Sequence, residues 1–181
     1  MKKTNIIGSP RKNSKSCEIA AAFCNTAEKN GAVINSYKLN EMNFSGCQGC
    51  YGCKRDKNYC VIKDDLQEVI EKISETDALV ISTPIYIWDV PGQVKCFIDR
   101  LYSFKDSDWK TKLSDGKKVI FVQTQGREEG MFKNVSEKYE QIMKTLGFSE
   151  VHIIRACNFV NPNKEVPYEF IDEARVLASK F

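Results

Sequence analysis

Four cysteines stand within residues 46–60 of this 181-residue sequence, in the stretch GCQGCYGCKRDKNYC. Their spacing is C-x2-C-x2-C-x6-C, and a glycine precedes each of the first three. Thiolates spaced in this way can ligate an iron–sulfur cluster or zinc, or form a redox-active dithiol. The candidate metal ligands are Cys47, Cys50, Cys53 and Cys60. We call residues 46–63 the cysteine loop.

A [4Fe–4S] cluster suits the cysteine loop best, because such a cluster takes four thiolates and the glycines can turn N–H groups towards sulfur. Structural zinc sites usually use two cysteine knuckles set well apart, whereas three of these cysteines fall within residues 47–53. A C-x-x-C dithiol would leave Cys60 unused. A run that binds nothing is the fourth hypothesis, and all four stay open.

A second segment that could bind a ligand is GSPRKNSKSC, residues 8–17. Serine hydroxyls, an arginine and the free N–H groups of a following helix are suited to a phosphate, and the helix dipole favours an anion. A Walker P-loop is excluded because Gly-Lys-Ser/Thr is absent. A polar turn with a helix cap is the alternative. The candidate cofactor residues are Ser9, Arg11, Ser14, Ser16 and Cys17, although Cys17 also suits helix packing, as do Cys24, Cys96 and Cys157.

Two further segments carry aromatic or polar side chains where loops are expected. TPIYIWDVPGQ, residues 83–93, places Tyr86 and Trp88 outside a core element, where their rings could flank a planar heterocycle. TQGREEG, residues 124–130, is polar and contains two glycines. Each has a simpler explanation when taken alone, such as an aromatic cover for the end of a sheet.

The elements that must position these segments alternate along the chain. Short runs rich in β-branched residues predict strands at 4–8, 33–39, 78–83, 118–124 and 151–156. Apolar residues at helical spacing lie between the strands, for example at Leu66, Val69, Ile70 and Ile73. Asp65 and Glu68 are the expected capping pair of this helix. A last helix is expected from 168 to 181. This alternation predicts a parallel sheet that is covered by helices on both faces.

The strand order follows from the first loop, because a Rossmann half would need G-x-G-x-x-G after the first strand. Its absence favours the flavodoxin-like order 2-1-3-4-5 in a single domain of residues 1–181. In such sheets ligands bind beyond the carboxyl ends of the strands, where the order reverses. The three loops follow strands one, three and four, so together they predict a flavin mononucleotide (FMN) site.

Three motifs give the chain a family resemblance. GSPRKNSKS, STPIYIWDVPGQVKCFIDR and the cysteine run resemble the NADPH-dependent FMN reductase family, and more narrowly its iron–sulfur flavoprotein branch. The resemblance is strongest over residues 6–101 and weak beyond about 130. It implies that Ser9, Arg11, Ser14 and Ser16 hold the FMN phosphate. It implies isoalloxazine contacts from Pro84, Ile85, Tyr86, Ile87 and Trp88, and from the more divergent Thr124, Gln125 and Gly126.

The activity that we expect is that of an FMN-dependent oxidoreductase that passes electrons between FMN and a [4Fe–4S] cluster. NAD(P)H or ferredoxin is the expected donor, and the acceptor is a quinone, an oxygen species or another flavin. No catalytic side chain is needed beyond the cofactors. The cluster is expected at the flavin end of the sheet, facing the flavin of a neighbouring subunit, and the family's oligomers imply a homodimer or homotetramer. The alternatives are a cluster-free NAD(P)H-dependent FMN or quinone reductase and a non-enzymatic flavodoxin-like electron carrier.

Charge and hydropathy argue against other classes of protein. The formal net charge is only +3, and the basic residues are scattered, so no nucleic-acid surface is predicted. Apolar runs stay well short of the roughly 18 residues that span a bilayer, and no signal-peptide pattern follows Met1, so we expect a cytoplasmic protein. His152 is the only histidine, which makes a hydrolytic triad improbable.

Overall fold

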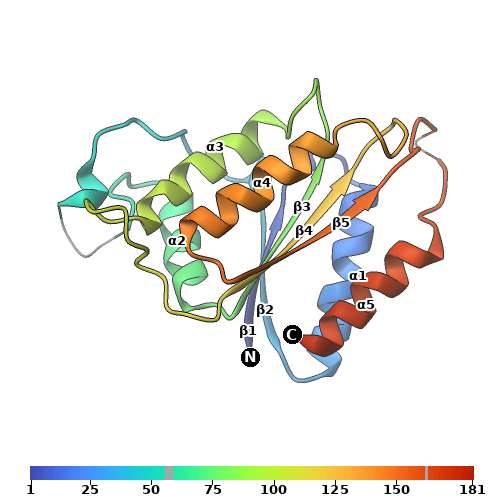
Figure 1. The fold of residues 1–181 in the computed structure, drawn as a ribbon, viewed down its shortest axis with the longest axis horizontal. Helices are drawn as coiled ribbons and strands as arrows, with labels where there is room; N and C mark the ends of the chain where they lie inside the picture. The colour runs from blue at the N-terminus through green and yellow to red at the C-terminus, as the bar shows by residue number, and fades with distance from the viewer. Residues whose placement is uncertain (56–58, 162) are drawn as a thin grey trace.

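Five parallel strands form the centre of the computed structural model, which describes residues 1–55, 59–161 and 163–181. The strands are β1 (Lys2–Ile7), β2 (Val33–Lys38), β3 (Ala78–Pro84), β4 (Lys118–Thr124) and β5 (Glu150–Ala156). Their order is β2-β1-β3-β4-β5, as Figure 1 shows. The predicted flavodoxin-like order is therefore confirmed. Residues 56–58 of the predicted cysteine loop lie outside the described residues, as does Pro162.

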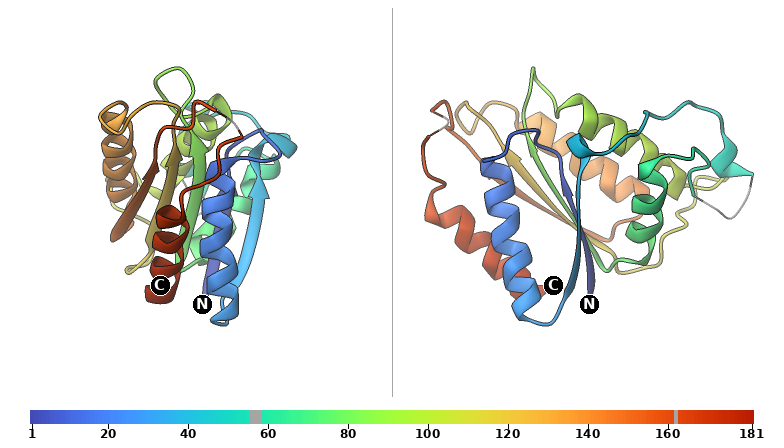
Figure 2. Two further views of the ribbon diagram at one scale, coloured as in Figure 1. Left: turned by 90° about the vertical axis from the view of Figure 1, so that its right-hand side faces the viewer. Right: turned by 180° about the vertical axis from the view of Figure 1, so that it is seen from behind.

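Helices cover both faces of this sheet. On one face lie α1 (Lys15–Lys29) and α5 (Tyr168–Lys180), which pack side by side. On the other lie α2 (Asp65–Glu75), α3 (Gly92–Arg100) and α4 (Lys133–Leu146). Figure 2 shows the same arrangement edge-on and from behind. Because the crossovers between parallel strands are helical, all five strands end in loops at the same edge of the sheet.

Helix α2 illustrates how the apolar spacing becomes packing. Its four predicted core positions are fully buried: Leu66, Val69, Ile70 and Ile73. The N-cap is Asp64 and not Asp65, because the Asp64 side chain accepts a hydrogen bond from Leu66 N at 3.1 Å. Asp65 instead accepts from Asn43 N at 2.6 Å, which ties the start of the helix to the chain before the cysteine loop.

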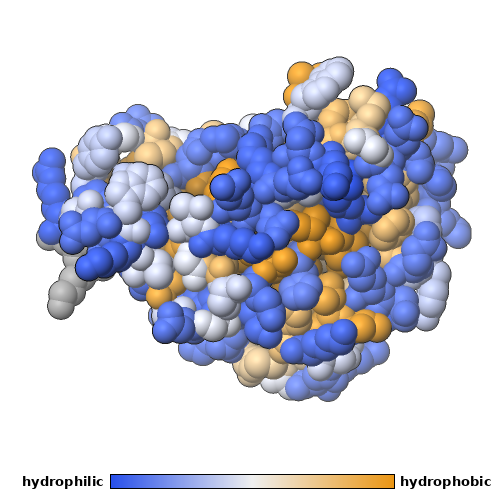
Figure 3. All heavy atoms as spheres, in the orientation of Figure 1, coloured by the Kyte–Doolittle hydropathy of each residue, from blue (hydrophilic) through white to orange (hydrophobic). Residues whose placement is uncertain are grey.

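The core follows from the position of each strand in the sheet. Strand β3 lies in the middle, and its first six residues are buried. Strand β5 forms one edge, and its Val151 and Ile153 are only partly buried. In Figure 3, apolar atoms appear between polar ones on this side of the molecule, below α4. Within the described residues, no helix has both the length and the apolar character to cross a membrane.

Candidate functional site

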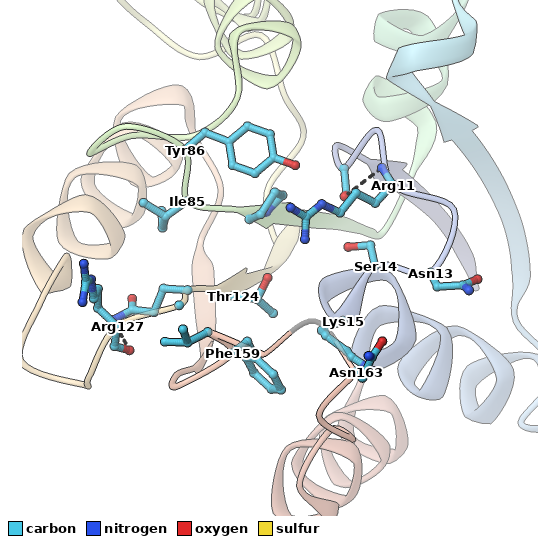
Figure 4. A pocket seen from close by; sticks show the side chains of 15 residues that line it. Arg11, Asn13, Ser14, Lys15, Ile85, Tyr86, Thr124, Arg127, Phe159 and Asn163 are labelled. Carbon is cyan, nitrogen blue, oxygen red and sulfur yellow. Dashed lines mark hydrogen bonds between the residues drawn. The ribbon is translucent and has the colours of Figure 1, made fainter.

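A pocket of about 650 Å³ opens at the carboxyl ends of β1, β3, β4 and β5. Figure 4 shows its lining, in which the Arg11 side chain extends towards the Tyr86 ring and Phe159 lies on the opposite side. The lining residues are Ser9, Arg11, Asn13, Ser14, Lys15, Pro84, Ile85, Tyr86, Thr124, Gln125, Gly126, Arg127, Phe159, Val160 and Asn163. The three predicted loops thus meet in one cavity, within the size range of small-molecule sites.

Gly8 allows the β1–α1 loop to leave the sheet closely packed against α3. Gly8 N donates to Ser82 O at 2.8 Å, and Gly8 O accepts from Gln93 Nε2 at 2.9 Å. A Cβ atom at this position would lie 2.3 Å from Val94 Cγ2 and 2.9 Å from Ser82 O. Only glycine therefore fits here without moving a strand or a helix.

The loop then presents polar groups to the pocket beside the start of α1. Ser9 Oγ accepts from Arg11 N at 3.3 Å. Ser14 is the N-cap of α1, but its Oγ lies 2.9 Å from Ser16 Oγ and makes no capping bond within the described part of the chain. The first-turn N–H groups of a helix have no intrahelical partners. Together with the Arg11 guanidinium, they make this end of the pocket electropositive.

A tight two-residue turn follows β3 and carries Tyr86 to the pocket. Tyr86 and Asp89 pair through Tyr86 N to Asp89 O at 2.7 Å and Asp89 N to Tyr86 O at 3.1 Å. Ile87 and Trp88 form the turn with φ values of 40° and 62°. Both lie in the left-handed region, which is unusual for a β-branched or bulky residue. Such strain is kept only where the surroundings determine the conformation.

Asp89 anchors this turn to α4. Its carboxylate accepts from Tyr139 Oη at 2.8 Å and from Lys138 Nζ at 2.6 Å. Burial alone would raise the pKa of Asp89, but the hydrogen bonds from Lys138 and Tyr139 outweigh it and hold the pKa below its usual range. Burial and the contact with Asp89 raise the pKa of Tyr139. Tyr139 therefore stays protonated and donates to a charged carboxylate at neutral pH.

Gln125 organises the loop after β4. Its Nε2 donates to Glu128 O at 2.7 Å and Met131 O at 2.8 Å, with a longer contact to Arg127 O at 3.4 Å. Its Oε1 accepts from Gln123 Nε2 at 2.9 Å. Although Gln125 lines the pocket, its amide is fully engaged in shaping the loop that carries Arg127.

The loop after β5 forms a side of the pocket that the sequence reasoning missed. Phe159 N donates to Gln125 O at 3.1 Å, and Asn158 N donates to Arg127 O at 3.0 Å, so the two loops support each other. The residues that were not predicted are Asn13, Lys15, Arg127, Phe159, Val160 and Asn163. The part of the pocket formed by the loop after β5 could have been predicted, because that loop must reach the same edge of the sheet as the other three.

The predicted cofactor residues divide into two groups. Nine line the pocket: Ser9, Arg11, Ser14, Pro84, Ile85, Tyr86, Thr124, Gln125 and Gly126. Four do not. Ser16 is fully buried under Ser14, and the Cys17 thiol lies 3.9 Å from Ser82 Oγ at the base of α1. Ile87 and Trp88 stand at the tip of their turn, where 89% and 69% of their surfaces are exposed.

The cysteine loop forms a second, much smaller pocket. All four predicted ligands line it, together with Arg100 and Tyr102. Cys47 and Cys50 are exposed, Cys60 is partly buried and Cys53 is buried. Among the described residues, no three His, Cys, Asp or Glu side chains stand close enough to hold a metal ion. The donor set nevertheless fits a thiolate-ligated cluster in type and number, because four cysteines face one pocket.

Cationic side chains bind to residues that line this small pocket. Arg100 is fully buried and donates from Nε to Cys60 Sγ at 3.0 Å. Lys112 Nζ donates to Cys53 O at 2.6 Å, and Lys54 Nζ donates to Tyr102 O at 2.9 Å. Burial raises the pKa of the Cys53 thiol, an effect that the nearby lysine charges oppose. Burial outweighs the lysine charges, so the pKa of Cys53 stays above its ordinary value.

The two pockets lie at opposite ends of α3. Gly92, at the start of the helix, follows the Tyr86 turn, and Arg100, at its end, reaches the cysteine loop. Figure 1 shows the cysteine loop at the left of the molecule, away from the strand ends. Nine helical residues span about 14 Å. The cysteine loop therefore lines a pocket of its own, and no cysteine of the run lines the large pocket among the described residues. The expected approach of the loop to the flavin of a neighbouring subunit stays a prediction.

Comparison with known proteins agrees with this architecture. Across 99% of this chain and 78% of the relative, the sequence is 28% identical to an iron-sulfur flavoprotein from Archaeoglobus fulgidus. A second iron-sulfur flavoprotein, from Methanosarcina thermophila, is 34% identical over 55% of this chain and 52% of the relative. The match thus spans only about half the length of this and several other curated relatives.

The fold has a similar counterpart among solved structures. An NAD(P)H:quinone oxidoreductase from Methanothermobacter marburgensis superposes with a TM-score of 0.78 and 19% identity, over 98% of this chain and 97% of that one. At this identity the likeness concerns the fold. The sequence profile of the NADPH-dependent FMN reductase family matches residues 1–163. The chain therefore belongs to the NADPH-dependent FMN reductase family and has a flavodoxin-like fold.

Proposed function

We propose that the large pocket binds FMN and that the chain is an oxidoreductase of the iron–sulfur flavoprotein type, with a [4Fe–4S] cluster on the cysteine loop. The observation that carries the flavin assignment is the polarity of one cavity. Arg11, the serine hydroxyls and the α1 N-terminus supply its anion-binding end, while Tyr86 and Phe159 supply apolar walls. FMN has the same two ends, a phosphate and an aromatic ring system.

In this assignment the β1–α1 loop holds the phosphate through Ser9, Arg11 and Ser14. The ring system lies between the Pro84–Tyr86 segment and the Thr124–Gly126 segment, where main-chain groups can reach its polar edge. Ser16 supports Ser14 through their 2.9 Å contact and does not touch the ligand. Bound FMN supplies the conversion between two-electron and one-electron transfer. NAD(P)H is the electron donor that the family indicates.

The cluster assignment depends on the cysteine loop. Cys47, Cys50, Cys53 and Cys60 are the proposed ligands, and the relatives that are named iron-sulfur flavoproteins support this choice. A bound cluster supplies one-electron exchange. Because α3 separates the two pockets in one chain, we propose a homodimer or homotetramer in which the exposed Cys47 and Cys50 approach the flavin of another subunit. Ferredoxin is the proposed alternative electron donor, and a quinone or another small molecule is the proposed acceptor.

A cluster-free NAD(P)H-dependent FMN or quinone reductase is the second candidate. The name of the family, NADPH-dependent FMN reductase, supports it. Within the described residues, the cysteine side chains are also not gathered around a single point. In that case the flavin pocket would work alone, and the cysteine loop would be a structural element.

Anaerobic purification separates the two candidates. The first predicts roughly four iron and four sulfide per chain with broad visible absorbance in addition to the flavin bands. The second predicts flavin bands alone. Rapid mixing with NADPH should bleach the flavin in both cases. A protein that is loaded with FMN but is not reduced by NADPH, NADH or a reduced ferredoxin would contradict the proposed reaction.

A pair of cysteine variants provides the matched control. Cys60→Ser should lose iron and sulfide while it keeps FMN, since Cys60 lies outside the flavin pocket. Cys96→Ser, a partly buried cysteine on α3, should keep both. Equal iron content in the two variants would contradict the ligand assignment.

A further inference from the structure

The Arg100 guanidinium donates hydrogen bonds to the cysteine loop and to the residues that flank it. Its Nε donates to Cys60 Sγ at 3.0 Å, and Nη1 donates to Ser45 O at 2.9 Å. Its Nη2 donates to Ile62 O at 3.3 Å. The two remaining N–H groups form a bidentate pair with Asp64, at 2.6 Å and 2.9 Å. A guanidinium has five N–H donors, and all five are used here.

These acceptors lie on both sides of the four cysteines. Ser45 precedes Cys47 by two residues, whereas Ile62 and Asp64 follow Cys60 by two and four. Arg100 itself comes from the end of α3 and is completely buried. One rigid side chain from a separate helix therefore joins the entry and the exit of the cysteine loop and contacts one cysteine sulfur directly.

We infer that Arg100 is a positioning residue that closes the cysteine loop and presents the Cys60 sulfur to the cluster. The inference rests on the proposed cluster function. A buried charge of this kind is costly unless it is fully paired, so a site that keeps one needs all of its partners in place. The planar fork of arginine meets several acceptors in one plane, which the ammonium group of lysine does not. N–H groups that donate to cluster sulfur stabilise the reduced, more negative state.

The test uses Arg100→Lys, which keeps the positive charge next to Asp64 but removes the fork. Lys95→Gln is the control, because Lys95 lies on the same helix and makes an exposed pair with Asp99. The FMN-loaded full-length proteins are reconstituted anaerobically with ferrous iron and sulfide. Iron release to a chelator is then followed, and the midpoint potential of the cluster is measured by electron paramagnetic resonance during a redox titration.

The expected result is a roughly ten- to hundredfold weaker retention of iron in Arg100→Lys, as for other residues that support metal ligands. Its cluster potential should shift to more negative values, and its FMN affinity should not change. Lys95→Gln should match the wild type in all three measurements. If Arg100 only supported the fold, its variant would lose thermal stability but would keep the wild-type iron retention and potential, which would overturn the inference.

Hydrogen–deuterium exchange on the metal-free, FMN-loaded protein gives a readout that needs no cluster. Residues 45–55 and 59–64 should exchange faster in Arg100→Lys than in the wild type or Lys95→Gln. Equal exchange in all three would overturn the closing role. A wild-type protein that takes up no iron and sulfide would overturn the proposed cluster function and Arg100's role towards it. A loaded wild type with an equally tight Arg100→Lys would overturn only the role of Arg100.

Discussion

The two pockets of this protein are built in different ways. Around the large pocket, main-chain groups at the ends of adjacent strands hold the loops, as in Ile85 N to Thr124 O at 2.9 Å and Gln125 N to Ala156 O at 3.0 Å. Within the described residues the cysteine loop pairs with no strand, and it depends on side chains from elsewhere, above all the Arg100 guanidinium. The first geometry follows from the fold, whereas the second depends on a few specific residues. The comparison predicts where each pocket is most sensitive to mutation.

The largest effect on stability is expected at the anchor of the cysteine loop. Asp64→Asn leaves the fully buried Arg100 without its charged partner, and breaking a buried ion pair costs about 3–5 kcal/mol of unfolding free energy. Hydrogen bonds from Arg100 hold the pKa of Asp64 below its ordinary value despite burial. The stabilisation is therefore complete above an ordinary pKa of about 3.9 and is lost as the pH falls through the folded-state value.

Urea unfolding at neutral and acidic pH measures this effect. The difference between wild type and Asp64→Asn should be largest near neutral pH and should shrink below about pH 4. Asp89→Asn in the rim of the large pocket is the matched comparison. Because its charged partner Lys138 is partly exposed, and because an amide oxygen can still accept from Tyr139, that change should cost only about 1 kcal/mol. Equal losses in the two variants would break the proposed contrast between the pockets.

Gly8 is the position where the rim should be most sensitive. Gly8→Val would place a side chain against Val94 and the carbonyl of Ser82, which overpacks the junction between β1, β3 and α3. We expect a loss of about 1–3 kcal/mol of stability and much weaker FMN binding. Gly130→Ala is the control, because a Cβ there meets nothing within 4 Å. Wild-type FMN binding by Gly8→Val would show that the close packing of this loop does not shape the site.

Gln125→Leu tests whether the rim is shaped by hydrogen bonds to the loop and not by direct contact with ligand. The change leaves the carbonyls of Glu128 and Met131 without this donor, which should cost about 1–3 kcal/mol. Hydrogen exchange should increase in residues 126–131, and FMN affinity should fall through the displaced loop. Gln141→Leu on the exposed face of α4 should change neither measurement. Unaltered exchange in residues 126–131 would contradict the organising role of Gln125.

The smallest effect is expected at the tip of the Tyr86 turn. Asn and Gly tolerate positive φ in two-residue turns far better than Ile and Trp do. Replacing Ile87 with Asn and Trp88 with Gly should therefore raise the unfolding free energy by about 1 kcal/mol per residue. FMN affinity should be nearly unchanged, because neither side chain lines the pocket. A large loss of FMN affinity would indicate that Ile87 and Trp88 do contact the flavin, as the family resemblance implied.

The sequence predicted the strand order and the meeting of three loops because both follow from periodicity and from the rule that parallel strands end at one edge. It predicted Ser9, Arg11 and Ser14, which line the pocket, from the hydroxyl and cationic side chains of the first loop and from the family resemblance. It did not predict that the Gln125 amide would donate hydrogen bonds to carbonyls of its own loop. Nor did it predict that Ile87 and Trp88 would be exposed at the tip of their turn. Loop hydrogen bonds and turn conformations leave no periodic pattern in a sequence. The sequence also did not predict that, among the described residues, the cysteine loop and the large pocket share no lining residue, because that separation depends on how α3 packs.

The contribution of Arg100 also has no sequence signal. Arg100 is 40 residues away from Cys60 along the chain. From the sequence alone it would be taken for an ordinary surface charge at the end of a helix. Only the packing of α3 against the cysteine loop brings the two together. By contrast, Phe159 and Asn163 could have been included, because the loop after strand five must reach the rim that the other loops share.

The most direct measurement of the central claim compares FMN with riboflavin, which lacks the phosphate. Flavin-free wild type, Arg11→Ala and Lys12→Ala are each titrated with both ligands, Lys12 being an exposed neighbour outside the pocket. The wild type and Lys12→Ala should prefer FMN. Arg11→Ala should bind FMN roughly ten- to hundredfold more weakly and riboflavin unchanged, since a hydrogen bond to a charged group contributes about 1.5–3 kcal/mol. Equal affinity of the wild type for the two ligands, or an equal loss for both in Arg11→Ala, would contradict a phosphate site in the β1–α1 loop.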